Sequence, residues 1–98
     1  MPNPPDLTGH SILIVESERG SFLETLQDSI EELGAQCVVA DTSRWAAEIL
    51  ARFRFSAILI NAERRLLQSH DLPMVVYRGR NLSDVRGILK RLIEALAM

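Results

Sequence analysis

A run of four apolar residues, 12–15 (Ile-Leu-Ile-Val), constrains the fold of this chain more than any other feature. Three of the four are β-branched, and an unbroken apolar run of this kind is typical of a strand buried on both faces. Acidic and hydroxyl side chains follow at once, at Glu16, Ser17 and Glu18. Because sites in open α/β sheets form just outside the carboxyl ends of the strands, the run predicts the place of a site as well as a strand.

Strand-like and helix-like segments alternate along the rest of the chain. Periodicity predicts strands over residues 11–16, 36–40, 56–61 and 74–77, and helices over residues 20–33 and 43–53 and from about 81 to the end. A further helix of about one and a half turns is expected within residues 62–67. This alternation indicates a parallel sheet covered on both faces, and right-handed crossovers allow the strand order 2-1-3-4. We therefore expect an α/β fold with a doubly wound parallel sheet.

Helical spacing also predicts which side chains are buried. The apolar stripe of the second helix includes Trp45 and Phe53, and the buried stripe of the last helix begins at Leu82. Gly34 stands where a left-handed residue commonly ends a helix, and residues 41–43 (Asp-Thr-Ser) are all competent N-caps.

Length and composition limit the class of protein. The 98 residues allow one domain, and we expect residues 1–10, with three prolines, to be a flexible segment before a domain at residues 11–98. No apolar stretch approaches the roughly 18 residues of a membrane span, and the first residues lack the features of a signal peptide. A cytoplasmic location, away from membranes, is therefore expected. The single cysteine, Cys37, is expected to be a small buried strand residue.

Charge is unevenly distributed between the two halves of the chain. Residues 1–50 carry nine acidic and two basic side chains (−7), whereas residues 51–98 carry four acidic and nine basic ones (+5), which gives the net charge of −2. This pattern is compatible with solvated helix faces and ion pairs, or with a basic partner-binding surface late in the chain. Nucleic-acid binding by this domain is not expected, because no helix-turn-helix pattern is present and the pI is about 5.6.

The sequence offers little that could carry catalysis. Ser17 has no histidine and acid arranged to activate it, and there is no Gly-rich phosphate loop. His10 and His70 show no metal-ligand spacing, so we expect no metal site and no cofactor. We therefore do not expect an enzyme.

Two strand segments and the last helix resemble the receiver domains of response regulators in two-component signal transduction. Residues 12–18 are similar to the family's first strand, Ile-Leu-Ile-Val-Asp-Asp-Glu, and residues 55–61 are similar to Tyr-Asp-Leu-Ile-Leu-Leu-Asp. The closing amphipathic helix also matches. The resemblance implies a flavodoxin-like fold of the chemotaxis-regulator type. Receivers usually have five strands, so one strand–helix unit is expected to be missing here.

The resemblance also implies which site residues have changed. The family's phosphoacceptor aspartate corresponds to Asn61, whose amide is not a competent nucleophile. In the acidic pocket that binds Mg²⁺, Glu16 fits one place, Ser17 replaces the other carboxylate, and Glu18 follows. Glu16 and Glu18 are either ordinary polar residues or the remains of a cation site. We expect Glu16, Ser17 and Asn61 to cluster.

Receivers have a Thr or Ser after the fourth strand and a Lys after the fifth. If residue 77 ends the equivalent of the fifth strand, Arg78 takes the place of that lysine. If residue 77 ends the equivalent of the fourth strand, Arg78 takes the place of the hydroxyl residue. Arg78 and Arg80 are either solvated, or Arg78 reaches the cluster and pairs with Glu16.

These features favour a degenerate receiver, a pseudo-receiver that works without phosphorylation. We expect it to act by protein–protein interaction with a signalling partner or by homodimerisation, through an exposed edge of the fourth strand or through the last helix. The alternative is a small-ligand or cation sensor that uses the acidic cluster at the ends of the first and third strands.

Overall fold

The computed structural model describes residues 6–63 and 71–97. The elements are β1 (Ser11–Val15), α1 (Ser21–Glu32), β2 (Gln36–Ala40), α2 (Ser43–Arg52), β3 (Ala57–Asn61), β4 (Met74–Tyr77), a 3₁₀ turn (Leu82–Asp84) and α3 (Val85–Leu96). Each agrees with its predicted segment to within a few residues at its ends. The short helix expected within residues 62–67 falls mainly outside the described residues. No helix in the described ranges has the length and apolar character to cross a membrane.

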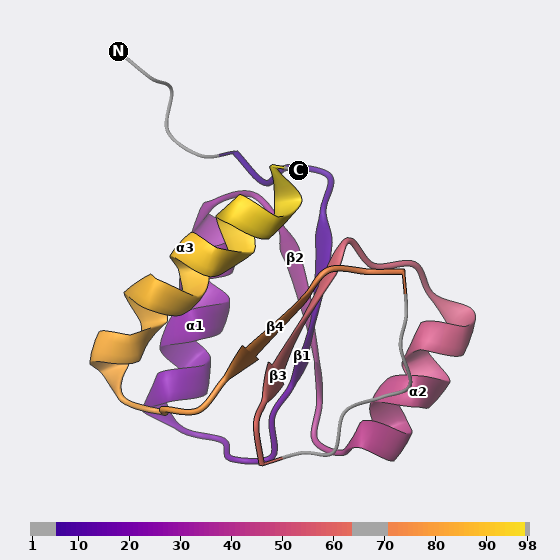
Figure 1. Ribbon diagram of the computed structural model, residues 1–98, viewed down its shortest axis with the longest axis horizontal. Coiled ribbons are helices and arrows are strands. Elements are labelled where there is room, and N and C mark those ends of the chain that lie inside the picture. Colours follow the sequence, from indigo (N-terminus) through magenta and orange to yellow (C-terminus); the bar gives the residue numbers. More distant parts are fainter. Residues whose placement is uncertain (1–5, 64–70, 98) are drawn as a thin grey trace.

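The four described strands form one parallel sheet in the order β2-β1-β3-β4. Helices α1 and α3 cover one face of the sheet, and α2 covers the other (Figure 1). The predicted doubly wound, flavodoxin-like fold is therefore confirmed. Within the described residues, β2 and β4 are the edge strands, because each pairs with a neighbour on one side only.

The core has two layers, one on each face of the sheet. Alternate residues of β1 enter opposite layers: Ile12 and Ile14 pack beneath α1 and α3, whereas Leu13 and Val15 pack beneath α2. Because β1 and β3 are central strands, both of their faces are buried, and this explains their unbroken apolar runs.

Three side chains that were expected to be buried are exposed. Trp45 is 50% exposed, Phe53 is 63% exposed and Leu82 is 57% exposed, so these predictions were wrong. The physical reason is that, among the described helices, only α2 lies on its face of the sheet, and it buries only a narrow stripe at Ala46 and Ile49. Phe53 lies past the end of α2 in an extended conformation, and Leu82 lies in the 3₁₀ turn before α3.

The N-terminal boundary was also placed too late. Leu7 is buried in the core, and its N–H donates a hydrogen bond to the carbonyl oxygen of Leu33 at 2.7 Å. Residues 6–10 therefore belong to the packed domain, whereas residues 1–5 lie outside the described residues. Two turn signals were confirmed: Gly34 has a φ of 101° after α1, and the Thr42 hydroxyl accepts a hydrogen bond from the Trp45 N–H at 3.0 Å.

Candidate functional site

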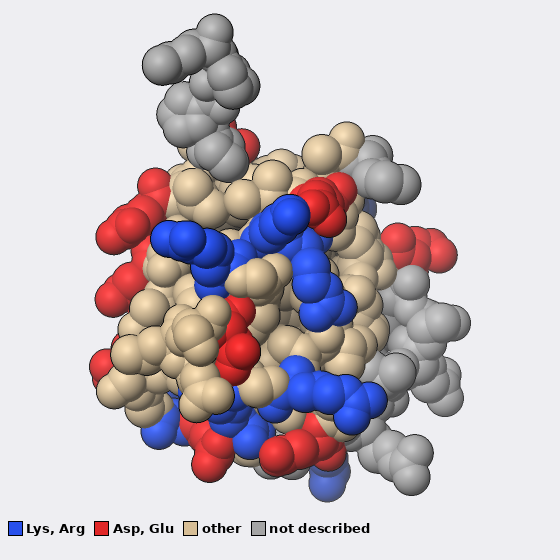
Figure 2. All heavy atoms as spheres, turned by 60° about the vertical axis from the view of Figure 1, so that its left-hand side comes forward, with Lys and Arg blue, Asp and Glu red and all other residues tan. Residues whose placement is uncertain are grey.

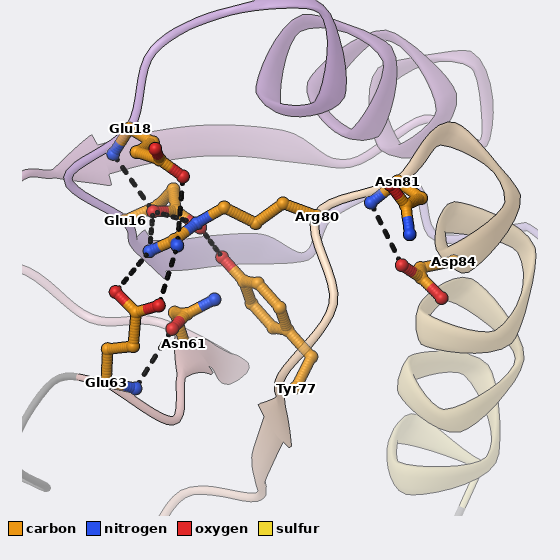
Figure 3. A network of polar contacts seen from close by, with 8 residues as sticks. All are labelled: Glu16, Glu18, Asn61, Glu63, Tyr77, Arg80, Asn81 and Asp84. Atoms are coloured by element: carbon orange, nitrogen blue, oxygen red, sulfur yellow. Dashed lines mark hydrogen bonds and ion pairs between the residues drawn. The ribbon is translucent and has the colours of Figure 1, made fainter.

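Three polar side chains meet at the carboxyl edge of the sheet. Glu16 directly follows β1, Asn61 ends β3, and Tyr77 ends β4. The strand register aligns Val15 with Ile60 and Asn61 with Tyr77, so the three side chains emerge from adjacent strands (Figure 3). The predicted proximity of Glu16 and Asn61 is thus a direct result of parallel pairing.

Glu16 is the centre of this site. Glu16 is fully buried, with an exposed fraction of 0%. Its carboxylate accepts hydrogen bonds from three other residues. The Tyr77 hydroxyl donates at 2.8 Å, the Glu18 N–H donates at 3.0 Å, and the Arg80 Nε lies 3.0 Å from each carboxylate oxygen. Buried carboxylates are costly unless they are paired in this way.

Arg80 links this buried carboxylate to two exposed ones. Its Nη2 lies 2.9 Å from Oε2 of Glu16, and its Nη1 lies 2.9 Å from Glu18 and 3.0 Å from Glu63. A second contact joins Nη2 to Glu63 at 3.2 Å. One guanidinium therefore serves three carboxylates, and the close-up in Figure 3 shows them converging on it. The planar, five-donor guanidinium is suited to such multiple pairing.

Burial, hydrogen bonds and charge in this network shift the pKa values of Glu16, Arg80 and Tyr77. Burial acts to raise the pKa of Glu16, but the hydrogen bonds from Arg80, the Glu18 N–H and Tyr77, with the positive charge of Arg80, lower it overall. Hydrogen bonds to Glu16 and Glu63 raise the pKa of Arg80. Burial, and then the hydrogen bond to Glu16, raise the pKa of Tyr77. At neutral pH, Glu16 is thus ionised, Arg80 is cationic and Tyr77 is neutral.

The loop before α3 directs Arg80 into the site. Asn81 and Asp84 form a capping box in which the Asp84 carboxylate accepts the Asn81 N–H at 2.9 Å. Gly79 makes this turn possible, because a Cβ at that position would lie only 2.2 Å from Oδ2 of Asp84. The ring of Tyr77 packs against Phe22 with centroids 5.6 Å apart, which holds its hydroxyl toward Glu16.

Asn61 is buried beside this network and is only half satisfied. Its Oδ1 accepts a hydrogen bond from the Glu63 N–H at 2.9 Å, so the side chain caps the turn after β3. Its Nδ2 is buried and has no hydrogen-bond partner among the described residues. An unpaired buried donor costs roughly 1–3 kcal/mol, which makes this atom the least satisfied part of the site.

The structure brings some of the predicted site residues together and leaves others apart. Glu16, Glu18 and Asn61 lie in the cluster, whereas Ser17 is half-buried and contributes none of the network's contacts. Arg78 is exposed, and Arg80 makes the pairing with Glu16 that we considered for Arg78. That alternative for Arg78 was wrong, because the capping box and Gly79 fix which arginine turns inward.

Three residues of the network were not predicted to belong to it: Tyr77 and Glu63, which were not considered, and Arg80, which was expected to be solvated. Tyr77 could have been found, because it ends a strand beside β3 in the predicted order. Glu63 gave no such signal, since it lies in the turn after β3. Chemically, the cluster is a closed set of ion pairs around one guanidinium. In the part of the chain that the structure describes, no three His, Cys, Asp or Glu side chains are arranged to hold a metal ion.

The comparisons with known proteins bear on the fold. No protein-family model matches the sequence, and no curated protein matches it. A solved structure titled as a yeast Spc42 trimeric coiled coil, amino acids 181–211, fused to another structure has a TM-score of 0.64 and 18% identity. The match covers 94% of this chain and 64% of that one, so the chain spans less than two thirds of its length. At this identity the likeness concerns the fold alone.

Proposed function

We propose that this chain is a receiver-like signalling protein of the pseudo-receiver type, which binds a protein partner or a second copy without being phosphorylated. The observation that carries the proposal is the pairing of Arg80 with Glu16. It supports a site in which the buried carboxylate is already paired with a cation from within the chain. The proposal implies a cytoplasmic protein and no catalytic activity of its own.

The chemistry of phosphoryl acceptance explains why this pairing matters. A carboxylate acceptor needs a nucleophilic oxygen, and the transfer needs a divalent cation to offset the phosphate charge. Asn61 supplies an amide at the end of β3, and a guanidinium already contacts the carboxylate that would bind the cation. A cation at Glu16 would have to displace a side chain bound through both carboxylate oxygens.

Intact-mass measurement after incubation with acetyl phosphate and Mg²⁺ tests the proposal. We expect no phosphoryl adduct under conditions in which a conventional receiver is labelled. The variant Asn61→Asp restores the carboxylate but leaves Arg80 in place, and we expect it to remain unlabelled as well. A labelled wild-type protein would contradict the proposal and return the chain to phosphorelay chemistry.

A second candidate function is favoured by the unpaired Nδ2 of Asn61. This buried donor is suited to an acceptor oxygen of a small ligand, which would make the cluster a small-ligand sensor. The cation-sensor form of this alternative gains nothing from Nδ2, because an N–H donor does not bind a cation, and it rests on the carboxylates alone. Calorimetric titration with Mg²⁺, Mn²⁺ and cyclic dinucleotides tests this alternative. Binding heats that disappear in Asn61→Ala would support it, and flat heats for every probe would count against it.

A further inference from the structure

In the ranges that the structure describes, no strand pairs with the outer edge of β2. The Gln36 N–H donates to the His10 carbonyl, and the Ala40 carbonyl accepts from the Glu16 N–H, both at 2.9 Å, so these two residues face β1. Backbone groups alternate along a parallel strand, and those of Cys37 and Val39 therefore point away from the sheet. The strand Gln-Cys-Val-Val-Ala contains no charged residue and no proline. Such residues usually protect an edge strand from pairing with another chain.

The opposite edge, at β4, is protected. Arg91 of α3 donates from Nη1 to the Val76 carbonyl at 2.9 Å and so occupies an edge acceptor. Arg78 and Arg91 are both exposed and line the groove between β4 and α3. Figure 2 shows Lys and Arg side chains gathered on this side of the molecule. A symmetric contact through β4 would bring these like charges of two copies together, which is unfavourable.

An exposed apolar surface adjoins the unprotected edge. Val38 is 39% exposed, and with Trp45 and Phe53 it makes up three of the four exposed large apolar side chains in the described ranges. All three line one groove of about 450 Å³ between β2 and α2. Exposed aromatic side chains beside a free strand edge are typical of a protein-binding surface.

We propose that this surface binds a second copy of the chain, with the two β2 strands pairing antiparallel about a twofold axis at Val38. The inference rests on the proposed function, because it specifies the surface through which a phosphorylation-independent protein would associate. The proposed contact is therefore the β2 edge, in place of the fourth-strand edge or the last helix expected from the sequence.

The register follows from which backbone groups are free. An axis at Val38 places Cys37 opposite Val39 of the second copy, and both of these residues have outward backbone groups. The pairing makes four backbone hydrogen bonds, two for each Cys37–Val39 pair. The two Val38 residues then face each other as a close, non-hydrogen-bonded pair with Cα atoms about 4.5 Å apart. Since Val38 lies on the α2 face, the aromatic side chains of both copies flank this central pair.

Charge complementarity supports a second copy as the occupant. Arg54 lines the groove together with Gln36, at the start of β2, whereas Asp41 directly follows Ala40 at its end. Antiparallel pairing brings the start of one strand to the end of the other, so each Arg54 approaches Asp41 of the second copy. No like charges oppose each other along the strand itself, because it has none.

The exposed apolar area indicates a weak dimer. A buried Trp or Phe contributes about 150–250 Å², so the exposed parts of Trp45 and Phe53 supply roughly 350–550 Å² in total from two copies. Stable interfaces bury about 1,200–2,000 Å², so the strands and α2 must supply the rest. We expect a dissociation constant in the range of about 1 μM or weaker.

Disulfide trapping tests this register directly. In Cys37→Ser/Val38→Cys, the two new cysteines face each other, and mild oxidation should give a disulfide-linked dimer. The control is Cys37→Ser/Leu82→Cys, which places a cysteine at a more exposed position beside α3 and should nevertheless remain unlinked. Equal linkage of both variants, or of neither, would overturn the proposal.

Light scattering over a concentration series provides the second measurement. Val38→Glu and, independently, Phe53→Ser should each weaken dimerisation at least tenfold, with thermal melting used to confirm that each variant is folded. A wild-type dimer that persists in both variants would overturn this surface while leaving the proposed function intact. A wild-type protein that stays monomeric throughout would overturn the inference, and the acetyl phosphate experiment judges the proposed function separately.

Discussion

Replacement of Arg80 by methionine should destabilise the protein substantially. The change keeps an apolar side-chain stem but removes the guanidinium that contacts both oxygens of the buried Glu16. Removing one partner of a buried ion pair costs about 3–5 kcal/mol. Glu16 would keep its bonds from Tyr77 and the Glu18 N–H, and Arg80 is 18% exposed, so water can follow the lost side chain. We therefore expect the lower value, a loss of about 3 kcal/mol.

Urea unfolding at neutral pH measures this loss, with Arg78→Met as the matched control. Arg78 is exposed, so its replacement should change the free energy of unfolding by no more than about 0.5 kcal/mol. A domain of this size is stable by about 5–15 kcal/mol, so Arg80→Met should remain folded at 25 °C. Its melting temperature should fall by roughly 12–24 °C.

The pH dependence gives a second, sign-specific test. In the wild-type protein the pKa of Glu16 is lowered. Ionised Glu16 therefore stabilises the folded state fully above the ordinary glutamate pKa, and this contribution is lost as the pH falls through the lowered pKa of the folded state. Without Arg80, burial should dominate and raise this pKa, so the variant gains stability relative to wild type as Glu16 is protonated. The difference between the two proteins should shrink from about pH 7 to pH 4. A loss below about 1 kcal/mol, or a difference independent of pH, would refute the reasoning.

Three further predictions concern the fold. Gly34→Ala should destabilise the protein by more than about 1 kcal/mol, because φ is 101° and a Cβ would lie 2.5 Å from a neighbouring hydroxyl. Gly87→Ala, in the open middle of α3, should instead stabilise the protein by about 1 kcal/mol. Thermal melting of the two variants measures both effects. Burial, and then a neighbouring negative charge, raise the pKa of Cys37 to about 12, so its thiol should react with a disulfide reagent much more slowly when folded than in urea. Thr42→Ala should cost about 1 kcal/mol in chemical unfolding, because the cap of α2 is lost.

The sequence was sufficient to predict the sheet, because strand character and chain order carry that information together. The unbroken apolar runs of β1 and β3 require burial on both faces, and only central strands are buried in that way. Parallel pairing then places Glu16 beside Asn61 without any knowledge of side-chain contacts. This part of the site could therefore be predicted from strand ends alone.

The choice between Arg78 and Arg80 could not be made in that way. The two lie two residues apart in one loop, and the residue that turns inward is set by the Asn81–Asp84 capping box and by the close approach at Gly79. Burial of Trp45 was mispredicted for a related reason. Periodicity identifies the apolar face of a helix, but the number of neighbouring elements decides how much of that face is covered.

The network at Glu16 has a consequence for how such a protein could be regulated. A bound Mg²⁺ exchanges with solvent, whereas Arg80 is covalently part of the chain, and its raised pKa keeps it charged at any physiological pH. Because the cation paired with Glu16 never leaves, neither cation concentration nor a kinase need change the state of this edge. Under the proposed function, the exposed surface at Val38 and Trp45 would then not be switched by phosphorylation at this edge. Association through a weak interface varies with the amount of protein, so abundance is the variable that would set the fraction of dimer if the proposed interface forms.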